Sequence, residues 1–376
     1  MRNSQGSTHV RPRMGVRIIP FALVLAGLIV FALTSIGSAR GRPKCFGQTA
    51  TIVGNNAANT ISGTARNDVI YAGGGNDTIK TPSGPKNQGR DIICGGPGND
   101  DIYGNGDSEK LIGGPGDDFI KSGNGKNLVV GDNAKPAGNL SGGTGRDDLV
   151  GGRGGDFMVG DNYASGNATG GASDKNFRAG AGPDVVIGDS ASVGTGNATG
   201  GGNDRMGGAD GNDLVIGDSY TKSGIAKGGG NDDNNSGPGN DLAVGDSYTV
   251  SGTAIGSGKD ALHAADGGDF GTKCKPDATA CPDVFYGDNY RQACAANRSV
   301  DANARVDVIR CENQNTQGGG VDLLTPDRGD DFMNGGLPDP DPGGTNVDRC
   351  SGGAGTDTAT SCHGIQGGFE KELPFP

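Results

Sequence analysis

The stretch GGPGNDDIYG at residues 95–104 returns as GGPGDDFIKSG at residues 113–123. Both copies place Gly-Gly-x-Gly-x-Asp before a short segment with one aliphatic residue two places after the Asp. Glycine supplies backbone angles that other residues avoid, which indicates a six-residue turn. The next three residues are enough for a short strand with one inward side chain. The pattern therefore predicts a repeated turn and strand, nine residues long.

The nine-residue spacing continues on both sides of these two copies. The sixth position of the repeat falls on Asp68, Asp77, Asp91, Asp100, Glu109, Asp118 and Asn127, with one five-residue insertion before Asp91. The aliphatic residue follows two places later each time, at Ile70, Ile79, Ile93, Ile102, Leu111, Ile120 and Val129. Two units then complete one coil of 18 residues. Coils of this kind stack as parallel strands, so units two apart lie above one another.

After residue 130 the coils become longer. Paired repeats recur at Asp147/Asp156, Asp174/Asp184, Asp204/Asp213, Asp232/Asp241 and Asp260/Asp269, and the second members advance by 28, 29, 28 and 28 residues. About ten extra residues per coil form a repeat of their own, as in GDSYTKSGIAKGG from Gly217. Because they follow the second strand of each coil, they are expected to leave the roll along one edge.

Two rows of side chains are predicted along this loop edge. Stacked Asp residues occur at Asp132, Asp161, Asp189, Asp218, Asp246 and Asp288, and Tyr residues two places on at Tyr163, Tyr220, Tyr248 and Tyr290, with Ala134 and Ala191 as gaps. One interpretation is that the loops pack on one another, and that the Asp side chains form hydrogen bonds within the turns or act as ligands for a metal ion. The other is a binding edge for glycans or another surface, because exposed Tyr is typical of recognition sites.

The composition argues against a large apolar core. Only 32% of the 376 residues are hydrophobic, Gly takes 76 positions and there is no Trp. A globular enzyme of this length carries more aliphatic and aromatic bulk, whereas each unit of a repeat array needs only a small share of core.

The N-terminal residues differ from the rest of the chain. Residues 1–17 hold four Arg and no acidic residue, an apolar run follows from Ile18 to Gly37, and small residues precede a cut after Ala39. This order predicts a secretory signal peptide over residues 1–39, although 20 apolar residues are also long enough for an uncleaved anchor. The remaining chain then has 28 basic and 44 acidic residues, a net charge of −16. Such a surface repels nucleic acid and attracts cations.

The segments GGPGNDDIY (95–103) and GGPGDDFIK (113–121) resemble the haemolysin-type, or repeats-in-toxin, nonapeptide family, whose pattern is G-G-x-G-x-D-x-U-x. The likeness covers most of residues 50–360. It implies an all-β fold, a parallel β-roll or right-handed β-solenoid, with several Ca²⁺ ions held between turns one coil apart. The implied side-chain ligands are Asp77, Asp100, Asp118, Asp147, Asp156, Asp184, Asp204, Asp213, Asp241, Asp260 and Asp269. Gly96, Gly98, Gly114 and Gly116 are the implied turn residues of these metal sites.

Some units depart from the family pattern. Glu109 and Asn127 replace Asp, which weakens or reshapes their sites. The residues after Asp232 lack the inward aliphatic, so the strand there is not expected to form. An even count of eight Cys in an exported chain implies disulfides, although the sequence alone allows 105 pairings. The likeness to secreted bacterial repeat proteins implies the pairs Cys45–Cys94 and Cys350–Cys362, and the remaining pairs are taken as Cys274–Cys281 and Cys294–Cys311.

No catalytic motif is recognisable. Neither His263 nor His363 lies in HExxH, and there is no GxSxG turn. The sequence therefore predicts a calcium-binding structural or adhesive protein that is secreted or held at the cell surface, and not an enzyme. Its partners are Ca²⁺ and a glycan or other surface at the loop edge, with no nucleic acid, and a membrane only if residues 1–39 stay attached. The alternative is an extracellular enzyme that acts on polysaccharides through the acidic loop edge.

The predicted organisation follows from these segments. It consists of the signal peptide (1–39), an N-terminal cap with the first repeats (40–94), the β-roll repeats (95–270), a Cys-containing insertion (271–320), terminal repeats with a C-cap (321–362) and a tail (363–376).

Overall fold

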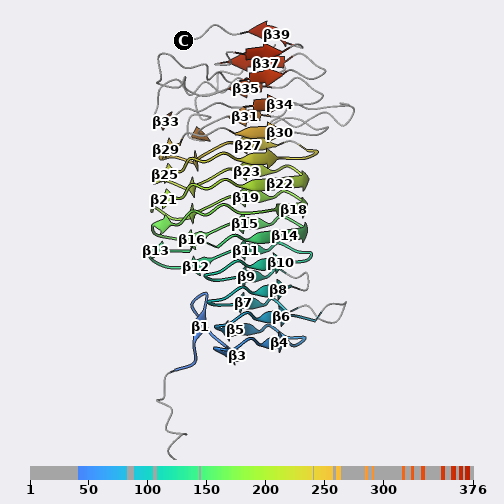
Figure 1. The fold of residues 1–376 in the computed structure, drawn as a ribbon, viewed down its shortest axis with the longest axis vertical. Coiled ribbons are helices and arrows are strands. Elements are labelled where there is room, and N and C mark those ends of the chain that lie inside the picture. The colour runs from blue at the N-terminus through green and yellow to red at the C-terminus, as the bar shows by residue number, and fades with distance from the viewer. Residues whose placement is uncertain are drawn as a thin grey trace, which may run out of the picture. The chain divides into compact units, whose positions relative to one another are not determined.

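The computed structural model describes residues 41–263 except 83–88, 105–107, 144, 240 and 257–259, and beyond residue 263 only the backbone of the strands between 284 and 372. Every described element is a β-strand. Apart from one antiparallel hairpin, all strand pairs are parallel, and Figure 1 shows successive coils stacked one above the other. The predicted fold class, a parallel β-roll, is confirmed.

Sheet 1 holds thirteen strands and sheet 2 holds twelve. The strands of sheet 1 are β3 (Ile52–Asn55), β5 (Val69–Gly73), β7 (Ile92–Cys94), β9 (Lys110–Ile112), β11 (Leu128–Val130), β15 (Phe157–Val159), β19 (Val185–Ile187), β23 (Leu214–Ile216), β27 (Leu242–Val244), β31 (Val284–Tyr286), β35 (Phe332–Asn334), β37 (Asp357–Thr360) and β39 (Phe369–Glu372). Those of sheet 2 are β4 (Thr60–Ser62), β6 (Thr78–Lys80), β8 (Asp101–Tyr103), β10 (Phe119–Lys121), β14 (Asp148–Arg153), β18 (Phe177–Ala181), β22 (Arg205–Asp210), β26 (Asp233–Asn235), β30 (Ala261–His263), β34 (Leu323–Thr325), β36 (Arg349–Ser351) and β38 (Gly364–Gln366).

The loop edge forms two further sheets of six strands each. Sheet 3 contains β12 (Asn133–Lys135), β16 (Asn162–Ala164), β20 (Ala191–Ser192), β24 (Tyr220–Thr221), β28 (Tyr248–Thr249) and β32 (Tyr290–Arg291). Sheet 4 contains β13 (Leu140–Ser141), β17 (Ala168–Thr169), β21 (Ala198–Thr199), β25 (Ile225–Lys227), β29 (Thr253–Ile255) and β33 (Thr316–Gln317). Coils up to β10 therefore have two strands, and from β11 to β34 they have four.

The nine-residue repeat sets the register of the inner core. Ile93 pairs with Leu111 and Leu111 with Val129 across sheet 1. All seven predicted inward aliphatics are fully buried, and they pack with Leu149, Met158, Phe177, Val186, Met206 and Val215 between sheets 1 and 2. One inward side chain per three-residue strand is thus enough to fill the narrow space between the two sheets.

The outer face of sheet 1 is also covered in the four-strand coils. Val130, Val159, Ile187, Ile216 and Val244 end their strands and pack against the residues of sheet 3. The predicted Tyr row lies in register there, because Tyr163 pairs with Ala191, Ala191 with Tyr220, and Tyr220 with Tyr248. The rings of Tyr220 and Tyr248 stack with centroids 5.7 Å apart. The loops therefore build a second core.

The N-terminus covers part of the same outer face in the two-strand coils. The hairpin of β1 (Lys44–Cys45) and β2 (Gln48–Thr49) is tied to β7 by the Cys45–Cys94 disulfide, which confirms that predicted pair. Its Phe46 ring lies 6.1 Å from the ring of Tyr163, and Lys110 Nζ lies 4.5 Å above it. The hairpin therefore takes the place of sheet 3 near the start of the roll.

One strand was not expected from the sequence. The residues after Asp232 form β26, which pairs with β22 and β30. Asn234 takes the inward position, is fully buried, and donates from Nδ2 to the carbonyl oxygen of Val244 at 3.1 Å. The expectation that this strand is lost is wrong, because pairing with both neighbours and one amide hydrogen bond hold it without an aliphatic side chain.

Several predicted features lie outside the described residues or are described only as backbone. The signal segment 1–39 lies outside them, as do Cys274, Cys281, Cys294, Cys311, Cys362, Asp269 and Asp288. Segment 271–320, for which an insertion is predicted, contributes β31, β32 and β33, which pair with β27, β28 and β29. None of the described residues belongs to a helix with the length and hydrophobicity that a membrane crossing requires.

Candidate metal centres

Three rows of acidic side chains run along the turns. Row A precedes the strands of sheet 2 and comprises Asp77, Asp100, Asp118, Asp147, Asp174, Asp204, Asp232 and Asp260. Row B precedes the strands of sheet 1 and comprises Asp68, Asp91, Glu109, Asn127, Asp156, Asp184, Asp213 and Asp241. Row C follows the strands of sheet 1 in the four-strand coils and comprises Asp132, Asp161, Asp189, Asp218 and Asp246. All members of the three rows are buried.

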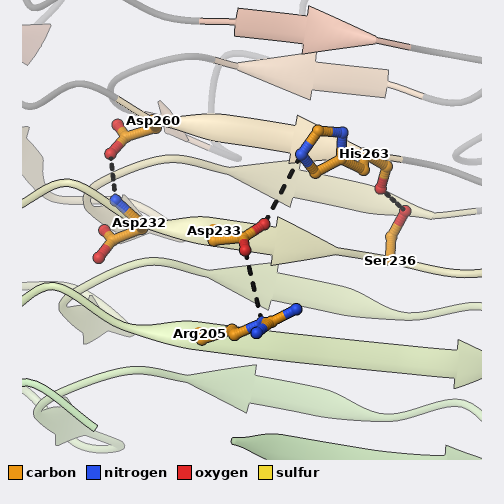
Figure 2. A network of polar contacts seen from close by, with 6 residues as sticks. All are labelled: Arg205, Asp232, Asp233, Ser236, Asp260 and His263. Atoms are coloured by element: carbon orange, nitrogen blue, oxygen red, sulfur yellow. Dashed lines mark hydrogen bonds and ion pairs between the residues drawn. The ribbon is translucent and has the colours of Figure 1, made fainter. Parts of the chain in front are cut away.

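One oxygen of each row A carboxylate is fixed by the backbone. The N–H of Asp77 donates to Asp100 Oδ1 at 2.7 Å, and the N–H of Asp100 donates to Asp118 Oδ1 at 2.7 Å. The same bond recurs up to Asp232 and Asp260, at 2.9 Å, where Figure 2 shows it. Each Asp is therefore held by the coil before it, which orients every carboxylate of the row in the same way.

Adjacent acidic residues have opposite surroundings in this region. Asp232 is buried in row A, whereas Asp233, half exposed on the outer face of sheet 2, lies 3.5 Å from Arg205 Nε and 3.6 Å from His263 Nε2 (Figure 2). Asp233, which points outward, therefore has the Arg205 guanidinium beside it, whereas Asp232, which is buried, is hydrogen-bonded to the neighbouring turn.

The second oxygen of most row A and row B carboxylates is left without a hydrogen-bond donor. This holds for the buried Oδ2 atoms of Asp77, Asp100, Asp118, Asp147, Asp174, Asp184, Asp204, Asp213 and Asp232. A buried polar atom without a partner costs about 1–3 kcal/mol, and more when it is charged. A regular row of ionised carboxylates therefore needs a positive partner, and without a cation the groups take up protons instead.

Asn127 shows what these oxygens face. Its Oδ1 accepts the N–H of Glu109 at 2.8 Å, as the Asp Oδ1 atoms do in the other turns. Its Nδ2 lies 3.5 Å from each of the carbonyl oxygens of Gly123, Asn124 and Gly125. In a turn with Asp, the atom at this position is an oxygen that faces carbonyl oxygens. The amide of Asn127 thus supplies the positive partner that a cation supplies elsewhere.

The turns themselves require glycine. Gly96, Gly98, Gly114 and Gly116 have φ between +108° and +144°, where other residues are strained. A Cβ on Gly114 would also collide with the carbonyl oxygen of Gly96 one coil below. The four predicted turn glycines therefore allow the stacked turns to approach closely, which brings the carbonyl groups of one turn near the carboxylate of the next.

Burial changes the protonation of these groups. Burial, with the nearby charge of Asp147, raises the pKa of Asp118 to about 10. Burial also raises the pKa of Asp147 and of Asp213 to about 8, and that of Asp100 and of Asp184 to about 7. Without a cation, much of the site would hold protons at neutral pH.

In four turns the acidic or amide side chain is satisfied by hydrogen bonds within the protein. Asp68 Oδ2 accepts from the N–H and the hydroxyl of Thr64 at 2.6 and 2.8 Å, and Asp156 Oδ2 accepts from the N–H of Gly152 at 3.2 Å. Glu109 accepts from the Thr81 hydroxyl at 3.3 Å, and Asn127 brings its amide. Of the predicted ligands, Asp156 therefore lies in the right row but has a donor for its second oxygen.

The remaining predicted ligands within the described residues lie in rows A and B, including Asp241 and Asp260, which are buried and make further contacts, whereas Asp269 lies outside the described residues. The sequence-based set omits Asp174 and Asp232, whose Oδ2 atoms are donor-free. Their nine- or ten-residue spacing from Asp184 and Asp241 was the signal that could have found them.

The fold and these rows define a class of protein, a parallel β-roll whose stacked glycine turns surround donor-free carboxylates. The family model described as RTX calcium-binding nonapeptide repeat (4 copies) matches residues 53–81, 87–102 and 103–134. These segments are therefore haemolysin-type calcium-binding repeats, and the resemblance seen in the sequence is confirmed for them. No curated protein matches it.

Proposed function

We propose that Ca²⁺ binds between successive turns of rows A and B and that the roll folds only when these sites are filled. The proposed ligands are the nine Asp with a donor-free Oδ2, together with turn carbonyl groups such as those at Gly96, Gly98, Gly114 and Gly116. Asp156, Asp241, Asp260 and Asp269 belong to the same set by position in the repeat. Carboxylate and carbonyl oxygens are the ligands that Ca²⁺ prefers.

The row of donor-free oxygens carries this proposal. Extracellular Ca²⁺ modules bind at roughly 10⁻⁴–10⁻³ M. Free Ca²⁺ at ten times that constant contributes about 1.4 kcal/mol per site to the folded state. Nine such sites contribute on the order of 10 kcal/mol, which is comparable with the whole stability of an ordinary domain. Metal binding and folding would then be one process.

The experiment is a calcium titration of the chain after treatment with EGTA. We expect the β-sheet circular dichroism signal to be lost in the chelator and to return with millimolar Ca²⁺. An equal concentration of Mg²⁺, which keeps its own waters and demands octahedral geometry, is expected to restore much less. A full β signal in EGTA at neutral pH would overturn the proposal.

We further propose that the chain acts outside the cytoplasm, after cleavage behind Ala39. The Cys45–Cys94 disulfide supports this, because disulfides persist in oxidising compartments. The proposed organisation of the exported chain is a stapled cap (40–94), a roll (95–270), a Cys-containing segment (271–320) and terminal repeats (321–362) closed by Cys350–Cys362, before the tail. N-terminal sequencing of protein from the culture medium tests the cut, since a first residue other than Arg40 contradicts it.

Within that location a structural role, or adhesion through the outside of the roll, fits better than catalysis. The alternative enzyme needs carboxylates that a polysaccharide can reach, yet row C is fully buried. The Tyr row packs in the second core, and Tyr248 is buried, which favours loop packing over a glycan site. A glycan array with the calcium-loaded chain tests whether the loop edge binds glycans. Binding that is abolished in Tyr220→Ala would show that the loop edge is a glycan-binding surface.

A further inference from the structure

Row C meets row A inside the four-strand coils. In these coils the turn between sheets 1 and 2 is opened at a Gly-Asp pair, and sheets 3 and 4 are inserted there. The second position of the pair, a glycine in the two-strand turn at Gly114, is Asp189, Asp218 and Asp246 in the three coils that read Gly-Asp-Ser. The longer coils therefore add a carboxylate at a turn where the shorter coils have only backbone.

The added carboxylates form two clusters with row A. Carboxylate oxygens of Asp189, Asp204 and Asp218 lie within 4.8 Å of one another. A second cluster joins Asp218, Asp232 and Asp246 within the same limit. Asp218 belongs to both, so the clusters follow one another along the stack. All five side chains are at most 2% exposed.

Donor-free oxygens point to a missing positive partner at these clusters. Both carboxylate oxygens of Asp189, which is 0% exposed, lack a hydrogen-bond donor, and so do the Oδ2 atoms of Asp204 and Asp232. The charges that act on Asp189 are all carboxylates, those of Asp204, Asp218, Asp161 and Asp232. Three like charges so close together and out of water repel strongly.

The preceding coil provides a comparison within the same row. It reads Gly-Asp-Asn, and Asn162 Nδ2 donates to the carbonyl oxygens of Gly142 and Thr169, the latter at 2.9 Å. Asp161 Oδ2 accepts the N–H of Ala172 at 3.2 Å. In the Gly-Asp-Ser coils the hydroxyl of Ser190 donates to the carbonyl oxygen of Gly170 at 2.8 Å, and neither carboxylate oxygen of Asp189 has a hydrogen-bond donor. Among the described residues, the three-carboxylate clusters occur only in the Gly-Asp-Ser coils.

We propose that two Ca²⁺ ions bind in these clusters, one among Asp189, Asp204 and Asp218 and the next among Asp218, Asp232 and Asp246. Asp218 bridges the two ions. The two ions then offset four of the five carboxylate charges, and three carboxylates can supply up to six oxygen ligands to a site that water does not reach. This site class rests on the proposed calcium function but differs from the nonapeptide turns, because a second row of side chains replaces turn carbonyls as ligands.

The test counts Ca²⁺ bound per full chain by equilibrium dialysis and atomic emission. Asp218→Asn is expected to lose two ions, and Asp189→Asn and Asp246→Asn one each, because only Asp218 is shared. Asp233→Asn, whose carboxylate faces outward, is the matched control and keeps the wild-type count. Asp184→Asn, in row B, reports on the nonapeptide sites alone and is expected to lower the count by itself.

The outcomes separate the two proposals. If Asp184→Asn lowers the count while Asp218→Asn leaves it unchanged, the clusters hold protons and the inference is wrong, although the nonapeptide sites stand. Equal losses in Asp218→Asn and Asp189→Asn would contradict the shared ligand. A wild-type chain that binds no Ca²⁺ overturns the proposed function itself. Should Asp218→Asn fail to fold in Ca²⁺, the Asp189→Asn and Asp246→Asn variants and the calcium anomalous signal of wild-type crystals decide the matter.

Discussion

The two-strand coils up to residue 127 and the four-strand coils after it use the same nine-residue repeat but balance charge and cover apolar surface differently. In the first region each turn holds one carboxylate or its amide substitute, and the N-terminal hairpin covers sheet 1. In the second, row C brings additional carboxylates and sheet 3 covers sheet 1 with Tyr and Ala. The longer coils therefore gain apolar packing and, with it, a larger buried negative charge.

The nine-residue repeat therefore determines how the coils stack, whereas the inserted loops determine how strongly the stability of the stack depends on cations. Burial and neighbouring carboxylates raise the pKa of Asp174, Asp189, Asp204 and Asp232 well above the usual value, and all four lie in the four-strand coils. We therefore expect the second region to respond most to pH and to chelation.

The largest expected effect is a reversal of the pH dependence of stability when calcium is removed. A carboxyl whose folded-state pKa is raised stabilises the fold below the unfolded value near 4, and that stability is lost as pH rises through the folded value. With Asp100 near 7, Asp147 near 8 and Asp118 near 10, the metal-free chain should be more stable at pH 4 than at pH 8. In Ca²⁺ the order inverts, because the ion needs ionised carboxylates.

The measurement is urea denaturation at the two pH values, in EGTA and in millimolar Ca²⁺, with hydrogen exchange to resolve the regions. Residues 128–263 should lose protection before residues 52–127 when the pH of the EGTA sample is raised. Equal loss in both regions would show that row C adds nothing to the cation dependence.

Much of this architecture could be predicted from the sequence, because spacing alone determines register. The buried positions from Ile70 to Val129 and the stacked Tyr row follow from counting residues. Spacing does not reveal whether the second oxygen of a carboxylate accepts a hydrogen bond. The hydrogen bond from the N–H of Gly152 to Asp156 Oδ2 therefore could not be predicted. Spacing also does not reveal that a strand can form around Asn234, because parallel pairing with both neighbours replaces the aliphatic side chain.

The second prediction concerns the cap of the two-strand region. Cys45 and Cys94 are 49 residues apart in the sequence. Closing a loop of that length stabilises the folded state by about 4 kcal/mol through the entropy of the unfolded chain. The double variant Cys45→Ser/Cys94→Ser should lose about that much stability in Ca²⁺, with hydrogen exchange accelerated mainly in residues 52–127. Acceleration spread evenly to residue 263 would mean that the two regions unfold as one unit.

The third prediction concerns Asn127, at the last turn before the coils lengthen. Asn127→Asp keeps the Oδ1 acceptor but replaces the amide by an oxygen that faces three carbonyl oxygens. At neutral pH and a Ca²⁺ concentration just sufficient to fold the wild-type chain, the variant should be about 1–3 kcal/mol less stable, the cost of a buried unsatisfied polar atom. In excess Ca²⁺ it should regain most of that loss and bind one more ion.

Asn124→Asp is the control for Asn127→Asp, because it adds the same charge to an exposed position of the same turn. Calorimetric titration of both variants gives the ion count. A stability loss that Ca²⁺ does not reverse would show that the position of the Asn127 amide is not a cation position.

The smallest expected effect concerns Asn234, a polar residue at an inward position of the four-strand region. Asn234 lies between Met206 and Leu262 in the inner column, and its Oδ1 is buried without a donor. Asn234→Leu should raise stability by about 1 kcal/mol, because it removes that orphan atom and buries apolar surface. The carbonyl oxygen of Val244 keeps the N–H of Gly217 at 2.9 Å, so the change leaves no new unsatisfied group. Asn235→Leu, on the exposed face of the same strand, should change stability by less than about 0.5 kcal/mol in denaturation experiments. A loss of stability in Asn234→Leu would mean that the hydrogen bond from Asn234 Nδ2 to Val244 stabilises this coil. It would also mean that the space between sheets 1 and 2 does not accept a leucine there.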